Sequence, residues 1–171
     1  MRKVEVVPHN SEWQEMFTVA AAGIAEVLQS NLVEIYHIGS TSIPTIYAKP
    51  IIDLLVAVNQ IEAVDRQNRA MKKLGYRAMG EFGISDRRFF RRDNSAGIRT
   101  HHVHMFPVGS PQIKRHLAFR DYLLAHPTAA QEYSELKRQL AKQYPYDIDS
   151  YMDSKDEFIK NIDRQAATNY L

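Results

Sequence analysis

Apolar and polar residues follow two different periods along the chain, and the first of them is helical. Apolar residues recur every three to four positions over residues 13–28, a pattern that predicts an amphipathic helix. Ser11 and Gln14 have the spacing of a capping box at its start. A second helix is predicted over 61–74, where Gly75 is typical of a helix C-terminus. The C-terminal part predicts three more helices, over residues 112–125, 128–144 and 153–169.

The second period is that of β-strands. Segments 33–38 and 50–58 are rich in β-branched residues and bounded by turn residues, and the loop 39–49 joins them. The patterns between the second helix and the helical tail predict three further strands, over residues 76–79, 87–92 and 100–108. This order of elements is typical of an α+β fold rather than of regular βαβ alternation. We therefore predict a mixed or antiparallel sheet flanked by helices, with a helical C-terminal part.

The length of 171 residues fits a single domain, because no repeat, low-complexity tract or Gly/Ser-rich linker interrupts the chain. The composition shifts near Ser110, from strand-like to helix-like sequence. We interpret that shift as two parts of one domain covering residues 1–171, sheet-rich over 1–109 and helical over 110–171.

Composition narrows the possible functions. The 22 basic and 20 acidic residues leave a net charge of +2, which does not favour a dedicated nucleic-acid-binding protein. The absence of cysteine excludes disulfides, thiolate nucleophiles and cysteine zinc sites. The N-terminal sequence MRKVEVVPHN has no apolar signal core, and the apolar stretch 51–58 is too short to span a bilayer. We therefore expect a cytoplasmic protein without a membrane partner.

The loop after the first predicted strand has the composition of a phosphate-binding loop. It begins with Gly39, Ser40, Thr41 and Ser42, and Lys49 lies at its end. Glycine lets a backbone approach phosphate closely, hydroxyl and N–H groups donate to the phosphate oxygens, and lysine adds positive charge. A polar turn between two buried strands is the alternative interpretation.

Asp53 stands inside the most apolar of the predicted strands. Burying a carboxylate there is costly unless a cation or hydrogen-bond donors compensate for the lost water. Asp53 is therefore a candidate ligand for a divalent cation that neutralises phosphate groups, and a candidate catalytic residue. No Gly-Lys-Ser/Thr follows the glycine, so the loop is not a P-loop.

Two histidines could complete this site. His102 and His104 alternate onto one face of their predicted strand, and imidazoles at that spacing can share a metal ion. If their strand lies beside that of Asp53, the three side chains would form a mixed site suited to zinc, manganese or another transition metal rather than magnesium. The alternative is that they only fill the sheet face with satisfied hydrogen bonds. His37 is expected to pack rather than to bind.

The segment DRRFFRRD, residues 86–93, carries four arginines. Alternation places Arg88 with Phe90 on one face and Arg87 with Phe89 on the other. Arginine suits phosphate oxygens, and we expect Arg88 to contact a phosphorylated ligand. A solvated edge strand protected by its charges is the alternative.

The segment HIGSTSIPTIYAKPIIDLLVAV, residues 37–58, resembles the signature of the GrpB-like family of the nucleotidyltransferase-fold superfamily. In that superfamily a Gly-Ser pair precedes a strand with Asp-x-Asp/Glu. The resemblance extends over almost the whole chain and includes Trp13, Phe17, RRFFR at 87–91, HVH at 102–104, FRDYL at 119–123, His126-Pro127, Tyr151, Lys155, Phe158 and Ile159. It implies a short mixed sheet flanked by helices, and transfer of a nucleotidyl group from a nucleoside triphosphate at a site with metal-bound carboxylates. Because it reaches Tyr151 and Lys155, Lys155 is the preferred phosphate-binding candidate in the helical tail.

The chain departs from the superfamily pattern at its second carboxylate. Leu55 occupies the position two residues after Asp53 and shares its strand face, so only Asp53 can bind a metal there. The sequence Pro44-Thr45-Ile46 also lacks the glycine expected after the proline in GrpB-like relatives.

These observations predict a metal-dependent nucleotidyltransferase that acts on a nucleoside triphosphate and an unknown acceptor. Its ligand is expected to be a nucleotide or another phosphorylated small molecule, with magnesium, manganese or zinc as the divalent metal. The missing second carboxylate leaves a catalytically silent nucleotide-binding module as one alternative. A metal-dependent phosphohydrolase that uses the histidine pair is the other.

Overall fold

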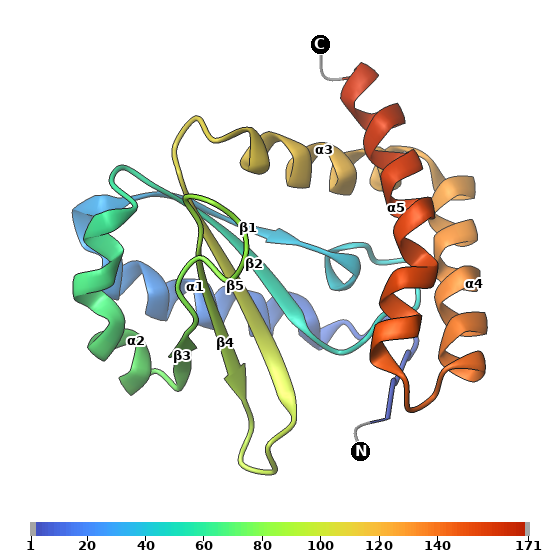
Figure 1. Ribbon diagram of the computed structural model, residues 1–171, viewed down its shortest axis with the longest axis horizontal. Coiled ribbons are helices and arrows are strands. Elements are labelled where there is room, and N and C mark those ends of the chain that lie inside the picture. Colours follow the sequence, from blue (N-terminus) through green and yellow to red (C-terminus); the bar gives the residue numbers. More distant parts are fainter. Residues whose placement is uncertain (1–2, 170–171) are drawn as a thin grey trace. The chain divides into compact units, whose positions relative to one another are not determined.

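A computed structural model describes residues 3–169 of the chain, which divides into two compact units (Figure 1). The first, called here the sheet unit, contains Glu12–Ile38 and Ile51–Lys114. The second, called the helical unit, contains Met1–Ser11, Gly39–Pro50 and Arg115–Leu171. Both units are discontinuous in sequence, because the chain passes from one to the other four times.

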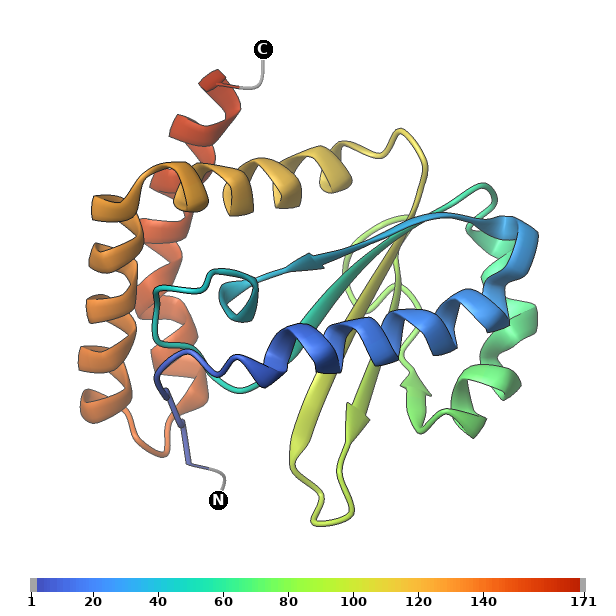
Figure 2. The same cartoon turned by 180° about the vertical axis from the view of Figure 1, so that it is seen from behind.

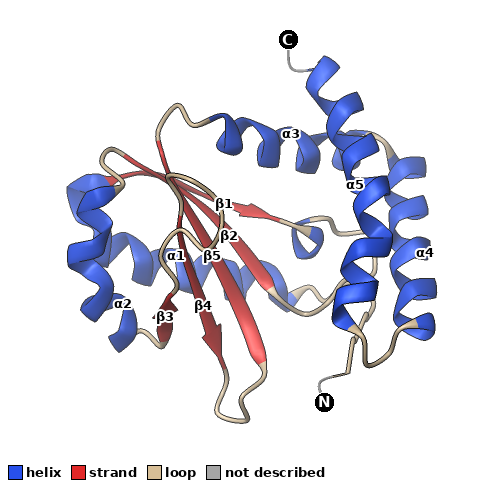
Figure 3. Ribbon diagram, viewed as in Figure 1, coloured by secondary structure: helices blue, strands red, loops and turns tan. Residues whose placement is uncertain are grey.

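The sheet unit holds a five-stranded sheet with the order β1-β2-β5-β4-β3 (Figure 3). The strands are β1 (Leu32–Ile38), β2 (Ile52–Val58), β3 (Tyr76–Ala78), β4 (Arg88–Asp93) and β5 (Arg99–Pro107). β2 and β5 pair in parallel and the other neighbours pair antiparallel, so the sheet is mixed. The predicted α+β fold with a short mixed sheet is confirmed.

Helix α1 (Glu12–Leu28) lies across one face of this sheet (Figure 2). Phe17 of α1 stacks on His37 of β1 with 4.9 Å between ring centroids, so His37 packs as predicted. The helix predicted over 61–74 is instead a 3₁₀-helix, Glu62–Gln67, followed by the short helix α2 (Asn68–Lys73). Side chains recur at nearly the same spacing in both helix types, so the apolar period cannot separate them over such a short segment.

The central position of β2 explains its apolar sequence. It has strands on both sides, and Leu54, Leu55, Val56 and Val58 are fully buried. Asp53 is the exception on this strand, with 26% of its side chain exposed. The sheet therefore presents one carboxylate at the beginning of its most buried strand.

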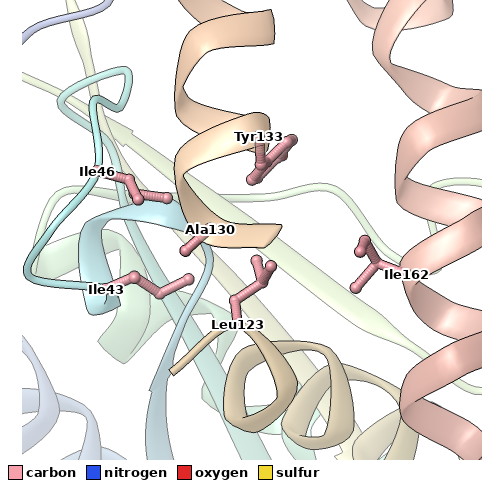
Figure 4. Close-up of a cluster of buried hydrophobic side chains, with 6 residues drawn as sticks. All are labelled: Ile43, Ile46, Leu123, Ala130, Tyr133 and Ile162. Atoms are coloured by element: carbon pink, nitrogen blue, oxygen red, sulfur yellow. The ribbon is translucent and has the colours of Figure 1, made fainter. Parts of the chain in front are cut away.

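The helical unit is built on α4 (Pro127–Gln143), α5 (Ile148–Asn169) and most of α3 (Pro111–Ala125). Its core gathers side chains from these helices and from the loop 39–50 (Figure 4), namely Ile43, Ile46, Leu123, Ala130, Tyr133 and Ile162. Ser134 of α4 accepts a 2.9 Å hydrogen bond from the backbone N–H of Tyr47, which ties the loop to the helix. Within residues 3–169, no helix has the length and apolar character needed to cross a membrane.

Candidate functional site

Sheet register brings three of the predicted site residues together in the sheet unit. Asp53 of β2 lies opposite His102 of the parallel strand β5, and Leu55 lies opposite His104. The three polar side chains therefore occupy one face of the sheet; alternation predicted this for the two histidines, and the pairing of β2 with β5 adds Asp53. His101 lies on the other face, where its ring meets Tyr76 edge-on at 6.2 Å.

Both histidines contact the same oxygen of Asp53. His102 Nδ1 lies 3.5 Å and His104 Nε2 lies 3.4 Å from Asp53 Oδ1. Among the described residues, none forms a hydrogen bond with the second carboxylate oxygen, Oδ2. One oxygen of this carboxylate is therefore fixed by protein groups, and the other is available to a ligand.

Each histidine also contacts an arginine, through the ring nitrogen that does not face Asp53. Arg99 Nη1 lies 3.3 Å from His102 Nε2, and Arg87 Nη1 lies 3.4 Å from His104 Nδ1. A guanidinium can only donate hydrogen bonds, so these two imidazole nitrogens must accept them. The hydrogen-bond network thus assigns the protons to His102 Nδ1 and His104 Nε2, the nitrogens that face Asp53.

This network keeps Asp53 ionised. Burial of the carboxyl group opposes its ionisation, but hydrogen bonds from His102 and His104 and electrostatic attraction to both rings outweigh that effect. The pKa of Asp53 is consequently held well below its usual range. Asp53 is a carboxylate at neutral pH and can serve as an anionic ligand.

An aromatic wall lies against the two imidazoles. The Phe89 ring centroid is 5.4 Å from that of His102 and 5.3 Å from that of His104, and Phe82 stacks on Phe89. The Arg87 guanidinium lies 4.8 Å from the Phe89 ring centroid and donates to the carbonyl oxygens of Glu81 and Phe82. Arg87 is therefore held in place from three sides.

The predicted phosphate contact Arg88 is engaged elsewhere. Its guanidinium binds the carboxylate of Asp65 through Nε at 2.7 Å and Nη2 at 3.2 Å. Strand alternation places Arg88 on the face opposite to Phe89. The arginines that reach the histidines are Arg87 and Arg99, which the sequence analysis did not select. Alternation with Phe89 was the signal that could have identified Arg87.

The three side chains do not form a ready three-ligand metal site. Within residues 3–169, no group of three or more histidine, aspartate or glutamate side chains has an arrangement that could hold a metal ion. The assigned tautomers give a physical reason, because a metal-binding imidazole nitrogen must be unprotonated. The ionised Asp53, with its open Oδ2, fits a cation that takes its other ligands from a bound molecule.

The remaining predicted residues belong to the helical unit. Gly39 has φ 75° and ψ −176°, a conformation that needs glycine, and Ser40–Ser42 form a 3₁₀ turn in which the Ser42 hydroxyl donates to the Gly39 carbonyl oxygen. Thr41 is buried. Lys49 Nζ and Lys155 Nζ lie 5.2 Å and 5.1 Å from the ring centroid of Tyr151.

Comparisons with known proteins agree with the resemblance found in the sequence. The chain is 48% identical to the UPF0157 protein YqkA of Bacillus subtilis. The match extends over 165 residues and covers 96% of this chain. It spans about half the length of YqkA, 48%. A crystal structure of the conserved protein GrpB from Enterococcus faecalis matches with a TM-score of 0.93 and 45% identity, over 97% of this chain and 99% of that one.

A weaker likeness links the chain to the Cid1 poly(U) polymerase, in a crystal structure of its H336N mutant bound to MgATP. The TM-score is 0.48 and the identity 9%, over 78% of this chain and 45% of the polymerase. The GrpB protein family itself matches over residues 3–165. With nearly the whole chain covered by that match, this protein belongs to the GrpB protein family.

Proposed function

We propose that the protein binds a nucleoside triphosphate at Asp53 with a divalent cation and transfers its nucleotidyl group to an acceptor. The observation that carries this proposal is the state of Asp53. Its Oδ1 is held by two imidazole N–H groups, its charge is maintained, and its Oδ2 is open. The resemblance of residues 37–58 to the superfamily signature supports the same chemistry.

A single carboxylate suits magnesium or manganese better than zinc. Magnesium is commonly held by one or two carboxylates together with substrate phosphates, whereas zinc prefers a closed set of protein ligands. When bound, the cation would neutralise charge on the phosphates. The zinc option in the sequence analysis depended on the histidines as ligands, and their N–H groups face Asp53 instead.

In the proposed reaction an acceptor hydroxyl forms a bond to the α-phosphorus. The bond from that phosphorus to the bridging oxygen breaks, pyrophosphate leaves with the electron pair, and the acceptor proton passes to solvent. His102 and His104 act as positioning residues, because they orient the Asp53 carboxylate and keep it ionised. Arg99 and Arg87 fix the tautomers that allow both contacts.

A catalytically silent nucleotide-binding module is the second candidate, and Leu55 favours it. Leu55 is fully buried at the position where the superfamily has its second carboxylate, so the sheet face carries one acidic ligand there. The same ligand could still bind a nucleotide through a cation. A phosphohydrolase built on a metal held by both histidines is less favoured, because the assigned tautomers present protons rather than lone pairs to Asp53.

The test uses nucleoside triphosphates labelled at the α-phosphate, with Mg²⁺ or Mn²⁺, and measures pyrophosphate release and labelled products. We expect Asp53→Asn to reduce turnover by at least about 100-fold, since the amide removes the charge that attracts the cation. The matched control is Asp156→Asn, which makes the same change at an exposed residue of α5. It should retain the wild-type rate.

The outcomes separate the candidates. Pyrophosphate release that survives in Asp53→Asn would overturn the proposed role of this carboxylate. Release of inorganic phosphate or nucleotide without transfer to an acceptor would indicate hydrolysis. Saturable binding of the magnesium nucleotide with no turnover would support the silent module.

A further inference from the structure

Three lysines and two tyrosines gather inside the helical unit, in a cluster of Lys49, Tyr133, Lys137, Tyr151 and Lys155. Lys49 ends the loop 39–50, Tyr133 and Lys137 lie on α4, and Tyr151 and Lys155 lie on α5. Lys137 is 1% exposed, Lys155 8% and Tyr151 0%. Lysine is rarely buried to this extent, so the cluster calls for an explanation beyond packing.

Two polar atoms of this cluster have no hydrogen-bond partner among the described residues. They are Lys137 Nζ and Tyr151 Oη, and both are fully buried. More than 90% of buried polar groups in proteins have a partner, and an unpaired ammonium is among the most costly exceptions. Lys137 Nζ lies 4.4 Å from the Tyr133 ring centroid, a cation–π contact that still leaves its N–H donors unbonded.

The charges around Lys137 are of the same sign. Burial and, to a lesser extent, the positive charges of Lys155 and Lys49 together lower the pKa of Lys137 to about 6. Lys49 Nζ and Lys155 Nζ both lie about 5 Å from the Tyr151 ring, at 5.2 Å and 5.1 Å. The cluster thus concentrates positive charge around the rings of Tyr133 and Tyr151, and a bound anion would relieve the repulsion.

We propose that Lys49, Lys137, Lys155 and the Tyr151 hydroxyl form an anion site that takes the phosphate groups of a polyphosphate or nucleoside triphosphate. Lysine ammonium groups and a phenol O–H are donors, and phosphate oxygens accept several hydrogen bonds at once. The proposal adds Lys137 and Tyr151 to the two lysines predicted from the sequence. It does not depend on Asp53, which belongs to the other unit.

The probe is sodium tripolyphosphate, added in the presence of EDTA so that no cation at Asp53 contributes. Calorimetry on the whole chain should show saturable binding. Lys137→Met should weaken it at least about tenfold, and Tyr151→Phe roughly threefold, because a charged donor contributes more than a neutral one. Lys142→Met is the matched control, since it removes the same charge from an exposed position of the same helix.

Two further arms identify the ligand and keep the two proposals separate. ATP should bind as tripolyphosphate does, and adenosine, which lacks phosphate, should not bind at this site. Asp53→Asn should bind tripolyphosphate like the wild type in EDTA, so a loss of transfer in that variant says nothing against the anion site. If adenosine bound as tightly as ATP, the nucleoside and not the phosphate groups would make the contact, and the proposal would be overturned.

A measurement on the wild-type chain avoids any effect of substitutions on folding. Because burial lowers the pKa of Lys137 to about 6, we expect its amine to take up a proton when the anion binds at pH 8. Calorimetry in buffers with different ionisation enthalpies measures that uptake directly. Proton uptake on binding would support the proposal, whereas no tripolyphosphate binding at millimolar concentration, or equal losses in Lys137→Met and Lys142→Met, would each overturn it.

Discussion

Arg99 and Arg87 determine which nitrogen of each site histidine carries the proton. Each donates to one nitrogen of a histidine and thereby leaves the other nitrogen to donate to Asp53. The two histidines use opposite nitrogens for this, Nδ1 in His102 and Nε2 in His104. Protonating either ring would place two donors against each other and break its contact with arginine.

These tautomers can be observed directly. Nitrogen-15 NMR on labelled imidazoles should show a proton on Nδ1 of His102 and on Nε2 of His104. In Arg99→Met, His102 should populate both tautomers, because its Nε2 no longer accepts a hydrogen bond from Arg99. His104 should keep its single tautomer. The same tautomer in both wild-type rings would contradict the assignment.

His101, on the opposite face, makes stability depend on pH. Burial, with the nearby charges of Arg92 and His102, lowers the pKa of His101 to about 4 from 6.5. The unfolded chain therefore takes up a proton between these values that the folded chain does not, so stability is complete above pH 6.5 and falls as the pH drops toward 4. The free energy of unfolding should fall by about 3 kcal/mol over this pH range.

Urea unfolding between pH 4 and 7 checks this expectation, with His101→Phe as the comparison. The phenylalanine ring keeps the edge contact with Tyr76 but cannot titrate. The variant should lose less stability on acidification than the wild type. Parallel curves for the two proteins over this range would show that His101 is not responsible.

Sequence patterns identified Asp53 because a carboxylate is unusual inside an apolar strand, and His102 and His104 because strand alternation places them on one face. Sequence patterns did not predict that Arg87 and Arg99 contact the histidines. Arg87 precedes β4 in a loop, and Arg99 contacts a histidine only three residues away. Arg88 was selected for its charge, but its partner Asp65 lies 23 residues earlier in the chain. Such a partner becomes visible only when the fold brings distant elements together.

At the scale of elements, one hydroxyl group fixes the loop 39–50 on α4. Ser134, which is buried, accepts the hydrogen bond from the Tyr47 N–H. Ser134→Ala leaves that backbone donor without its partner and should reduce the free energy of unfolding by about 1–3 kcal/mol. Urea denaturation measures the loss. Ser154→Ala, an exposed serine on α5, should stay within about 0.5 kcal/mol of the wild type.

Element boundaries followed from the sequence where local chemistry sets them. All five strands were predicted within two residues of their observed ends, because turn residues bound them and β-branched residues are frequent in β1 and β2. The last helix begins at Ile148 rather than 153, since Asp147 accepts hydrogen bonds from the Ser150 N–H and hydroxyl and so starts the helix earlier. The spacing of apolar residues cannot reveal this cap, because it reports only the side of the helix that packs against the core.

For the whole molecule, the order of elements predicted the α+β class and the motifs predicted the GrpB-like family, and both are confirmed. The division into units could not be foreseen, because the loop 39–50 joins the helical unit through Ile43 and Ile46, far from its other core residues in sequence. The interpretation of the chain as a single domain stays a prediction, as does a cytoplasmic location. The burial of Lys137 could not be foreseen either, because it depends on how the helices pack in the folded chain.

Lys137 should also control how the stability of the whole chain responds to alkaline pH. Its pKa is lowered to about 6 when folded, from 10.5, by burial and by the charges of Lys155 and Lys49, with Tyr133 and Tyr151 as its titratable neighbours. Between these values only the unfolded chain holds the proton, so stability rises with pH, by about 1.4 kcal/mol per pH unit.

The comparison is urea unfolding of wild type and Lys137→Met at pH 7, 8 and 9. Methionine fills a similar volume without an amine, so this contribution disappears and the stability difference between the two proteins should change by roughly 2–3 kcal/mol across the range. A constant difference would mean that Lys137 keeps its proton in the folded chain. The ammonium would then need an anion beside it even in the absence of added phosphate, and the proton uptake expected on tripolyphosphate binding would vanish with it.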